Sequence, residues 1–279
     1  MMKSKYVIEL SRSLNETVST SSKGNQSKYL YKGKWYKLDC MGYEGLAEVL
    51  CSRLAKAINF PYETVEYRPC VAVTYYGDKT GCESDSFLKN DTAEYSLPRL
   101  MKHIYTTDID DLFRKSHSAA ERIQILCEKI SSLNGLSEFG RYLTAILEFD
   151  RLVLNEDRHF HNILVIHNMS SGIFGYAPLF DNGAALFSDT VMDYPLSEKA
   201  VACRKKIKAK PFSTDFDKQV NAAQSLFGAQ IKPPENIFIE TEDLYQYYDE
   251  KCITRCINTI RVQLQHYYPK VTVKFPESE

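Results

Sequence analysis

Residues 155–163 read NEDRHFHNI, and residues 180–183 read FDNG. In the first stretch Asp157 and Asn162 stand five positions apart, which is the spacing found in loops that transfer phosphoryl groups. In such loops the carboxylate lies beside the attacking hydroxyl, and the amide reaches a metal ion that bridges the phosphates. Asp181, in the second stretch, supplies a further oxygen ligand of the kind that Mg²⁺ prefers. The two stretches predict a phosphotransfer site with Asp157 as catalytic base and with Asn162 and Asp181 as metal ligands.

The surroundings of the two stretches strengthen this prediction. Each stretch alone is weak, because the Asp–Asn spacing recurs by chance and Asp-Asn-Gly is a common turn. Residues 137–154 carry apolar side chains at helical steps, with Ser137 as the expected N-cap. Residues 163–167 and 175–180 have the composition of two strands joined by a turn. A helix that leads into the first stretch and a hairpin that separates the two would bring their polar side chains together.

The order of expected elements indicates two lobes. Strands are predicted at 6–10, 28–39, 64–76 (broken at Pro69) and 81–88, around a loop at 11–27 and one helix at 43–58. Helices are predicted at 96–105, 119–133, 137–154, 216–227 and 242–267, with a final extended piece at 272–275. This order predicts an α+β, two-lobed protein-kinase-like fold. We expect a nucleotide-binding N-lobe over 1–92 and a C-lobe over 93–279 that carries the catalytic and metal-binding residues.

Phosphoryl transfer from ATP also needs an N-lobe lysine, oriented by a glutamate on a helix. Lys37 is the best candidate, because it ends a strand just before helix 43–58. Lys28, Lys32 and Lys34 lie nearby in the sequence, and an alternative interpretation is that all four lysines are solvated surface charges. Glu48 is preferred as the partner of Lys37 over Glu44, which lies one turn earlier on the same helix face.

The loop at 18–27 lies where a phosphate-covering loop would be expected. Its predicted nucleotide contacts are Ser21, Ser22 and Gly24, since backbone amides and serine hydroxyls bind phosphate. A flexible surface turn is an almost equally good interpretation of this loop.

Composition excludes several classes of protein. The chain has 279 residues, of which 44% are hydrophobic and 25% charged, as in ordinary globular domains. A net charge of −1 shows no basic excess, so we expect no specific nucleic-acid partner. Eight scattered cysteines favour free thiols in a reducing cytosol over a disulfide set. The first ten residues lack an apolar h-region, so we expect no secretory leader, and the sequence has no run of about 18 apolar residues. These features predict a cytoplasmic protein without membrane contact, with export by a leaderless route as an alternative.

The two stretches, extended to NEDRHFHNILVI and APLFDNGAALF, resemble the HipA-like kinases, including their smaller, cell-translocating kinase A type. The segments YEGLAEVLCSRLAKA and GCESDSFL are also similar to the smaller members. The resemblance implies a serine/threonine protein kinase that uses ATP and Mg²⁺, with Asp157, Asn162, Asp181, Lys37 and Glu48 in the roles given above. It implies that His159 braces the loop, and that residues near Cys82–Phe87 border the adenine.

The resemblance also implies autophosphorylation in the phosphate-covering loop. The candidates there are Ser19, Ser21, Ser22 and Ser27. Many HipA-like kinases are toxins with an antitoxin partner. Only about 27 residues precede the hairpin here, so we expect the extra N-terminal domain of the full-length toxins to be absent. Toxin activity with an antitoxin-like partner and a stand-alone kinase with an unknown protein substrate are therefore equally plausible.

Other functions fit parts of the sequence. His159 and His161, with Asp157 and Asp181, could form a Zn²⁺ site of a metallohydrolase. A pseudokinase that binds nucleotide without transfer is a second alternative. A lipid or small-molecule kinase is a third, because phosphoinositide kinases share the DRHxxN pattern. The basic cluster 204–210 is interpreted as a solvated face, or instead as the lining of a substrate groove.

Overall fold

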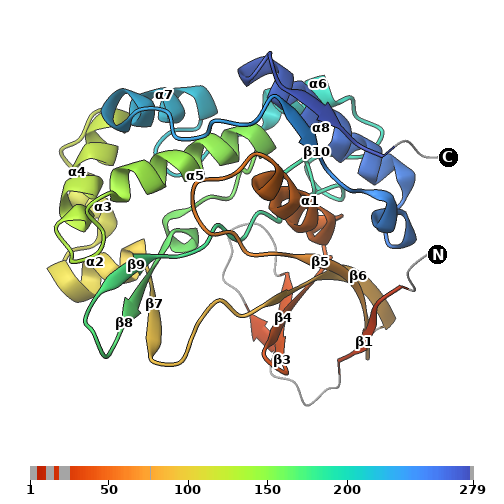
Figure 1. Cartoon of the computed structure of the whole chain (residues 1–279), viewed down its shortest axis with the longest axis horizontal. Coiled ribbons are helices and arrows are strands. Elements are labelled where there is room, and N and C mark those ends of the chain that lie inside the picture. The colour runs from red at the N-terminus through yellow and green to blue at the C-terminus, as the bar shows by residue number, and fades with distance from the viewer. Residues whose placement is uncertain (1–4, 11–15, 19–25, 76, 277–279) are drawn as a thin grey trace.

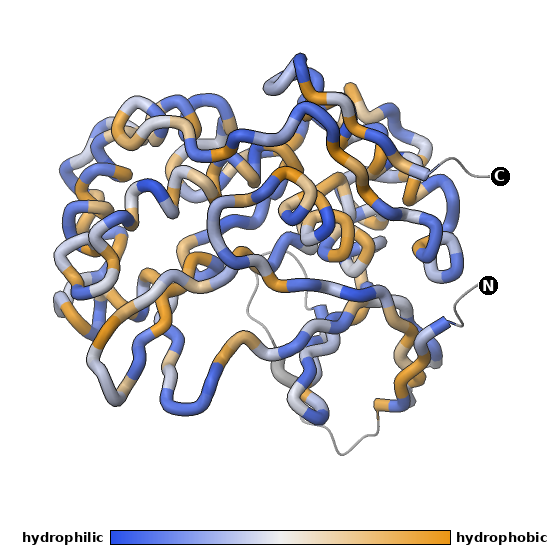
Figure 2. The backbone as a smooth tube through the Cα atoms, in the orientation of Figure 1, coloured by the Kyte–Doolittle hydropathy of each residue, from blue (hydrophilic) through white to orange (hydrophobic). Residues whose placement is uncertain are grey.

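The computed structural model describes residues 5–10, 16–18, 26–75 and 77–276. Strands dominate its N-terminal third, and helices make up most of the rest (Figure 1). Helix α1 (Glu44–Ala57) lies between the large sheet and the helical part. Hydrophobic residues gather toward the middle of the molecule, and hydrophilic residues predominate along the outer turns (Figure 2). This architecture confirms the α+β fold class predicted from the sequence.

Within the described residues, the large sheet has six strands in the order β1-β5-β6-β4-β3-β2. They are β1 (Val7–Glu9), β2 (Glu16–Val18), β3 (Ser27–Tyr31), β4 (Lys34–Leu38), β5 (Arg68–Thr74) and β6 (Gly77–Asp85). β1 pairs with β5 in parallel, and the other neighbours are antiparallel. Lys32 and Gly33 form the turn between β3 and β4 with φ angles of 49° and 77°, which a two-residue hairpin turn favours. The register pairs Leu30 with Trp35 and confirms the predicted hairpin.

Two parts of this sheet differ from the prediction. β2 lies inside segment 11–27, which is predicted as a loop, because its backbone pairs with β3 at the sheet edge, where a polar sequence is tolerated. β5 continues through Pro69, where a break is predicted. Val71 donates its backbone N–H to Tyr6 beside β1, whereas Pro69, on the same side of β5, lies beyond the end of β1. The missing N–H of the proline therefore costs no hydrogen bond between strands.

Helix α1 is held against the sheet by its apolar stripe and by one glycine. The stripe is fully buried and consists of Leu46, Val49, Leu50, Leu54 and Ile58. A Cβ atom on Gly45 would lie 2.6 Å from the backbone carbonyl carbon of Gly81. Glycine at this position therefore lets the first turn of α1 touch β6. This close approach fixes the position of Glu48, which lies about one turn further along the helix.

The helical part is built around α5 (Phe139–Val153), whose side chains are nearly all buried. Packed against it are α4 (Ala119–Ser131), α7 (Phe216–Phe227) and α8 (Glu250–Tyr267). The other helical elements are α2 (Leu97–Tyr105), α3 (Ile109–Phe113), α6 (Ala200–Lys206) and the 3₁₀ turns η1 (Phe160–Asn162) and η2 (Glu242–Gln246).

Two helix boundaries differ from the prediction. The N-cap of α5 is Glu138 rather than Ser137, because the N–H of Phe139 closes a turn onto the carbonyl of Leu136. The helix predicted over 242–267 is divided into η2 and α8. The extended backbone of Asp249, the N-cap of α8, interrupts it.

A second sheet lies beside the helical part, and the chain continues from its last strand to Asp181. Its strands are β7 (Thr92–Ser96), β8 (Leu164–Asn168) and β9 (Phe174–Tyr176). β7 occupies residues for which the sequence predicts no strand, and it is a strand because it pairs with β8. β9 is shorter than the predicted strand 175–180, because Leu179 donates its N–H to Glu63 and accepts one from Val65. This pairing holds the segment just before Asp181 against residues 63–65, which follow α1 in the chain.

The C-terminal stretch ends in a small parallel pair formed by β10 (Asn236–Phe238) and β11 (Thr272–Lys274), as expected for an extended piece. All eight cysteines carry free thiols, as predicted. In the part of the chain that the structure describes, no helix combines the length and the apolar character needed to cross a membrane.

Candidate active site

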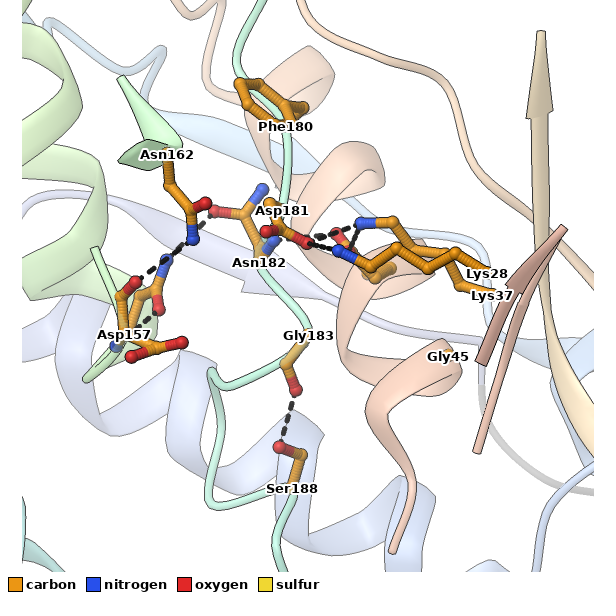
Figure 3. Close-up of polar contacts among 12 residues, drawn as sticks. Lys28, Lys37, Gly45, Asp157, Asn162, Phe180, Asp181, Asn182, Gly183 and Ser188 are labelled. Atoms are coloured by element: carbon orange, nitrogen blue, oxygen red, sulfur yellow. Dashed lines mark hydrogen bonds and ion pairs between the residues drawn. The ribbon is translucent and has the colours of Figure 1, made fainter. Parts of the chain in front are cut away.

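Two lysines on neighbouring strands converge on one carboxylate between the lobes (Figure 3). Lys28 of β3 and Lys37 of β4 are direct partners in the strand register, so their side chains leave the same face of the sheet. Like charges in such a pair repel each other. The Oδ1 atom of Asp181 lies 2.6 Å from the Nζ atom of Lys37 and 3.4 Å from that of Lys28. The shared carboxylate offsets the repulsion.

Glu48 links the strand lysine to the loop that follows β9. Its side chain is fully buried. Its Oε1 atom accepts a hydrogen bond from Nζ of Lys37, and its Oε2 atom accepts one from the backbone N–H of Asn182 at 2.8 Å. Glu44, the less favoured candidate, instead accepts backbone N–H groups from the loop that precedes α1. The structure therefore pairs Lys37 with Glu48, the partner that the sequence favours.

Lys37 and Asp181 both stay ionised in the site. Burial alone would lower the pKa of Lys37, but the carboxylates of Asp181 and Glu48 outweigh burial and raise this pKa well above its ordinary value. Burial alone would raise the pKa of Asp181, but the ammonium groups of Lys37 and Lys28 hold it well below its usual range. Lys37 and Asp181 are therefore charged at neutral pH, as phosphate and cation binding require.

The loop that carries Asp157 leaves the C-terminal end of α5 and is tied back to that helix by Asn155. The Nδ2 atom of Asn155 donates to Asp150 at 3.1 Å, and its Oδ1 atom accepts the backbone N–H of Asp157 at 3.1 Å. Further along the loop, Nδ2 of Asn162 donates to the backbone oxygen of Asp157 at 3.1 Å. This bond leaves the amide oxygen of Asn162 as the atom that can face a cation. Figure 3 shows the loop across from the two lysines, with Asp181 between them.

Arg158 joins the two predicted motifs and was not assigned a role from the sequence. Its side chain is 1% exposed and forms a buried ion pair with Asp150 at 3.0 Å. Its NH1 group donates to the backbone oxygens of Asn162 and Phe180, at 3.2 and 2.8 Å, and its NH2 group donates to Oδ1 of Asn182 at 2.7 Å. One guanidinium thus sets the distance between the loop and the segment that carries the second carboxylate.

The backbone at Asp181 has a φ angle of 57°, which non-glycine residues seldom adopt. Its neighbours hold this conformation from both sides. Arg158 binds the carbonyl of Phe180, and Glu48 binds the N–H of Asn182. Such conformations persist where the surrounding structure determines them, and they cluster at functional sites.

The predicted chemistry implies a Mg²⁺ ion, and the residues present fit one. Asp181 offers a charged carboxylate, and Asn162 offers an amide oxygen whose nitrogen is already bonded. Mg²⁺ commonly takes one or two protein ligands and completes its shell with phosphates and water. Both residues also line the two cavities described below.

His159 lies against the loop that carries Asp157 and does not line the larger cavity. Its Nε2 atom is 3.8 Å from Oδ2 of Asp157, and burial lowers its pKa. Its Nδ1 atom is buried without a hydrogen-bond partner among the described residues. The rings of His159 and His161 lie 5.8 Å apart at 79°. Within the described residues, no three His, Cys, Asp or Glu side chains are arranged to hold a metal ion.

Two cavities meet at Asn162 and Asp181. The larger one, of about 360 Å³, is lined by Lys37 and by residues 84–88, which end β6 and begin the connection between the two sheets. These residues overlap the Cys82–Phe87 stretch that is expected to border the adenine. The smaller one, of about 50 Å³, is lined by Asp157. The arrangement therefore offers a nucleotide-sized space on one side of the cation ligands and a small space beside the predicted base on the other.

The predicted nucleotide contacts Ser21, Ser22 and Gly24 lie outside the described residues. Ser19, a candidate for autophosphorylation, also lies outside them. Ser27, a further serine candidate, is the first residue of β3 and pairs with Val18, so it lies in a strand rather than in the loop.

Two lysines in the site were not recognised from the sequence. The sequence allows Lys28 to be a solvated surface charge, yet it reaches Asp181. The basic cluster 204–210 is interpreted first as a solvated face, yet the Nζ atom of Lys210 donates to Oδ1 of Asp157 at 2.8 Å. The position of Lys28 opposite Lys37 in the hairpin could have indicated the first of these, whereas no local pattern indicates the second.

No family model and no curated protein matches this sequence. A crystal structure of a Helicobacter pylori proinflammatory kinase, CtkA, aligns with 95% of this chain and 83% of that chain, with a TM-score of 0.51 and 14% identity. The chain has the fold of the HipA-like kinases. HipA of Shewanella oneidensis MR-1, solved as a toxin–antitoxin complex with HipB and operator DNA, aligns over 95% of this chain and 61% of that chain, with a TM-score of 0.47 and 13% identity. The likeness to the CtkA structure confirms the two-lobed kinase fold predicted from the sequence, and the chemistry has to be argued from this chain's own residues.

Proposed function

We propose that this HipA-like chain is an ATP-dependent serine/threonine protein kinase that uses Mg²⁺. One observation carries the proposal. Asp181, held charged between the lobes, is bonded to Lys37, whose ammonium is shared with the buried Glu48. A lysine–glutamate pair on strand and helix, beside a carboxylate at the start of an Asp-Asn-Gly turn, is the arrangement that kinases use to hold ATP and its metal.

Each residue has a distinct role in the proposal. Lys37 binds the α- and β-phosphates of ATP, and Glu48 orients it. Asn162 and Asp181 hold Mg²⁺, which when bound supplies positive charge to the phosphates. Asp157 accepts the proton of the acceptor hydroxyl, which enters beside it. The cavity that includes residues 84–88 takes the adenosine.

The acceptor is proposed to be a serine or threonine of a protein, including a serine of this chain's own loop. This part rests on the resemblance of the two motifs to HipA-like kinases. The same resemblance is the ground for proposing an antitoxin-like partner. A kinase with a lipid or small-molecule acceptor would use the same nucleotide site and would differ only beyond Asp157.

Intact mass after incubation with Mg²⁺-ATP tests the proposal. The wild-type chain should gain the mass of one or more phosphoryl groups, and Asp157→Ala should gain none, because removal of the base stops transfer. Asp110→Ala, at an exposed aspartate of α3, is the matched control and should behave as the wild type.

Three results would count against it. Equal phosphorylation of the wild type and of Asp157→Ala would remove the assigned base. ATP binding without transfer to the chain or to added protein would favour a pseudokinase, and transfer to a lipid alone would favour the lipid-kinase alternative.

A further inference from the structure

Lys210 contacts the predicted catalytic base from a distant part of the chain. Its Nζ atom lies 2.8 Å from Oδ1 of Asp157, 53 positions earlier in the sequence. The side chain of Asp157 is 8% exposed and that of Lys210 is 37% exposed. The ammonium thus stands at the opening of the site and donates a hydrogen bond inward to the carboxylate.

The backbone around Lys210 is held in place by a buried side chain. Gln219 of α7 is fully buried; its Nε2 atom donates to the backbone oxygen of Lys210 at 3.0 Å, and its Oε1 atom accepts the N–H of Phe212 at 3.4 Å. The N–H of Ala209 also closes onto the carbonyl of Thr214 at 3.0 Å. The lysine is therefore presented by an ordered turn and not by a free surface loop.

The same helix pair positions the lysine and the base. α7 packs against α5, and α5 leads directly into the loop that carries Asp157. Groups that are supported by packed helices keep a defined separation. The contact between Lys210 and Asp157 is thus a product of the rigid helical lobe.

Lysine side chains lie on both sides of the site, the nucleotide side at Asp181 and the acceptor side at Asp157. Lys28 and Lys37 are both bonded to Asp181, on the nucleotide side. On the acceptor side, the structure places the ammonium of Lys210 at Asp157. An acceptor hydroxyl has to come within about 3 Å of that carboxylate to lose its proton. During transfer, the phosphoryl group and the ammonium of Lys210 would therefore both lie beside the carboxylate of Asp157.

We propose that Lys210 is a catalytic residue that donates hydrogen bonds to a non-bridging oxygen of the phosphoryl group during transfer, while it also holds Asp157. The inference rests on the proposed kinase function and adds a residue to it. An ammonium carries three N–H donors, so it can serve the carboxylate and the phosphoryl oxygen together.

The reaction step balances without any further reactant. Asp157 takes the proton of the acceptor hydroxyl, and the acceptor oxygen bonds to the γ-phosphorus. The bond from that phosphorus to the bridging oxygen breaks, and its electron pair stays on ADP. Charge on the equatorial oxygens is the main quantity to be stabilised in this transition state. Lys210 stabilises it from the acceptor side and is left unchanged.

The experiment compares the wild type with Lys210→Met, Lys210→Arg and the control Lys208→Met, which alters an exposed lysine two positions away. Release and incorporation of phosphate from γ-labelled Mg²⁺-ATP give kcat, and calorimetric titration gives the Kd for ATP. Lys210→Met should lower kcat about 10²-fold, the usual effect of removing one donor to a developing negative charge, with Kd changed less than about twofold. Lys210→Arg should recover at least about tenfold, and Lys208→Met should match the wild type.

A double variant separates a direct role from support of the base. In the Asp157→Asn background, Lys210→Met should lower the residual rate by a further factor of about five or more. No further loss would mean that Lys210 acts only through Asp157 and would overturn the proposal, as would a kcat for Lys210→Met within about threefold of the wild type. Lys210→Gln replaces the Met variant if that variant does not fold. A wild type that neither releases nor transfers phosphate would refute the kinase function itself, and this inference with it.

Discussion

Replacement of Arg158 by methionine should destabilise the protein strongly, because Arg158 and Asp150 form a fully buried ion pair. Their side chains are 1% and 0% exposed. Removal of one partner from such a pair costs about 3–5 kcal/mol, since the other charge stays buried without compensation. For a domain of this size, each kcal/mol lowers Tm by about 2–4 °C, so Tm should fall by roughly 6–20 °C.

The pH dependence of this loss follows from the state of Asp150. Burial raises the pKa of Asp150, and Arg158 opposes that rise. Without the guanidinium, this pKa rises further above its value in the unfolded chain. A carboxyl with a raised folded-state pKa is stabilising when protonated, and this stability is lost as pH increases through the folded pKa. The penalty of Arg158→Met should therefore be larger at pH 8 than at pH 5.

Urea unfolding of wild type, Arg158→Met, Asp150→Asn and the double variant provides the assay. The double variant should regain at least about 2 kcal/mol relative to Arg158→Met, because the unpaired charge is gone. It should remain poor in phosphate transfer, because the carbonyls of Asn162 and Phe180 still lack their shared donor. A loss below about 1 kcal/mol in Arg158→Met, with no coupling to Asp150, would refute this account of the buried pair.

Three further predictions follow from individual contacts. Gly45→Ala would place a Cβ atom 2.6 Å from the Gly81 backbone, and this overpacking should cost about 1–3 kcal/mol and weaken ATP binding; an unchanged Tm would contradict the close approach. Burial raises the pKa of Asp39 to about 6, so its stabilising contribution is complete below about pH 4 and lost as pH rises through about 6. Relative to Asp39→Asn, the wild type should lose roughly 2–3 kcal/mol between pH 4 and 7 in urea unfolding, and parallel curves would exclude the raised pKa. Glu48→Gln keeps an acceptor for the N–H of Asn182 but removes the charge beside Lys37, so kcat should fall about tenfold or more, and a wild-type kcat would argue against the pair.

The parts of the fold that sequence predicts well are those with local causes. The hairpin at 28–39 follows from alternation and a Lys-Gly turn, and α1 follows from apolar residues at helical steps. Lys37 and Glu48 could be named because strand and helix are adjacent along the chain. Their contact needs only the close packing of α1 on the sheet.

The parts that sequence misses depend on pairing between distant segments. Nothing local distinguishes Lys210, which reaches Asp157, from the exposed Lys208 two positions earlier. Arg158 stands within the first motif, but nothing in the sequence links it to Asp150, which lies in the mostly apolar helix α5. β2 has a polar sequence and exists because β3 offers its edge. Long-range packing, not composition, determines these features.

The central claim is that Asp157 is the base of a phosphotransfer site. The most direct test mixes the protein with one equivalent of Mg²⁺-ATP and compares the rate at which bound ATP loses its γ-phosphate in the wild type and in Asp157→Asn. ATP affinity is measured on the same samples. The account predicts a rate about 10²–10⁴-fold lower in Asp157→Asn, with ATP affinity nearly unchanged, because Lys37, Glu48 and Asp181 are intact. Equal rates in the two proteins, or no phosphate loss from the wild type, would contradict it.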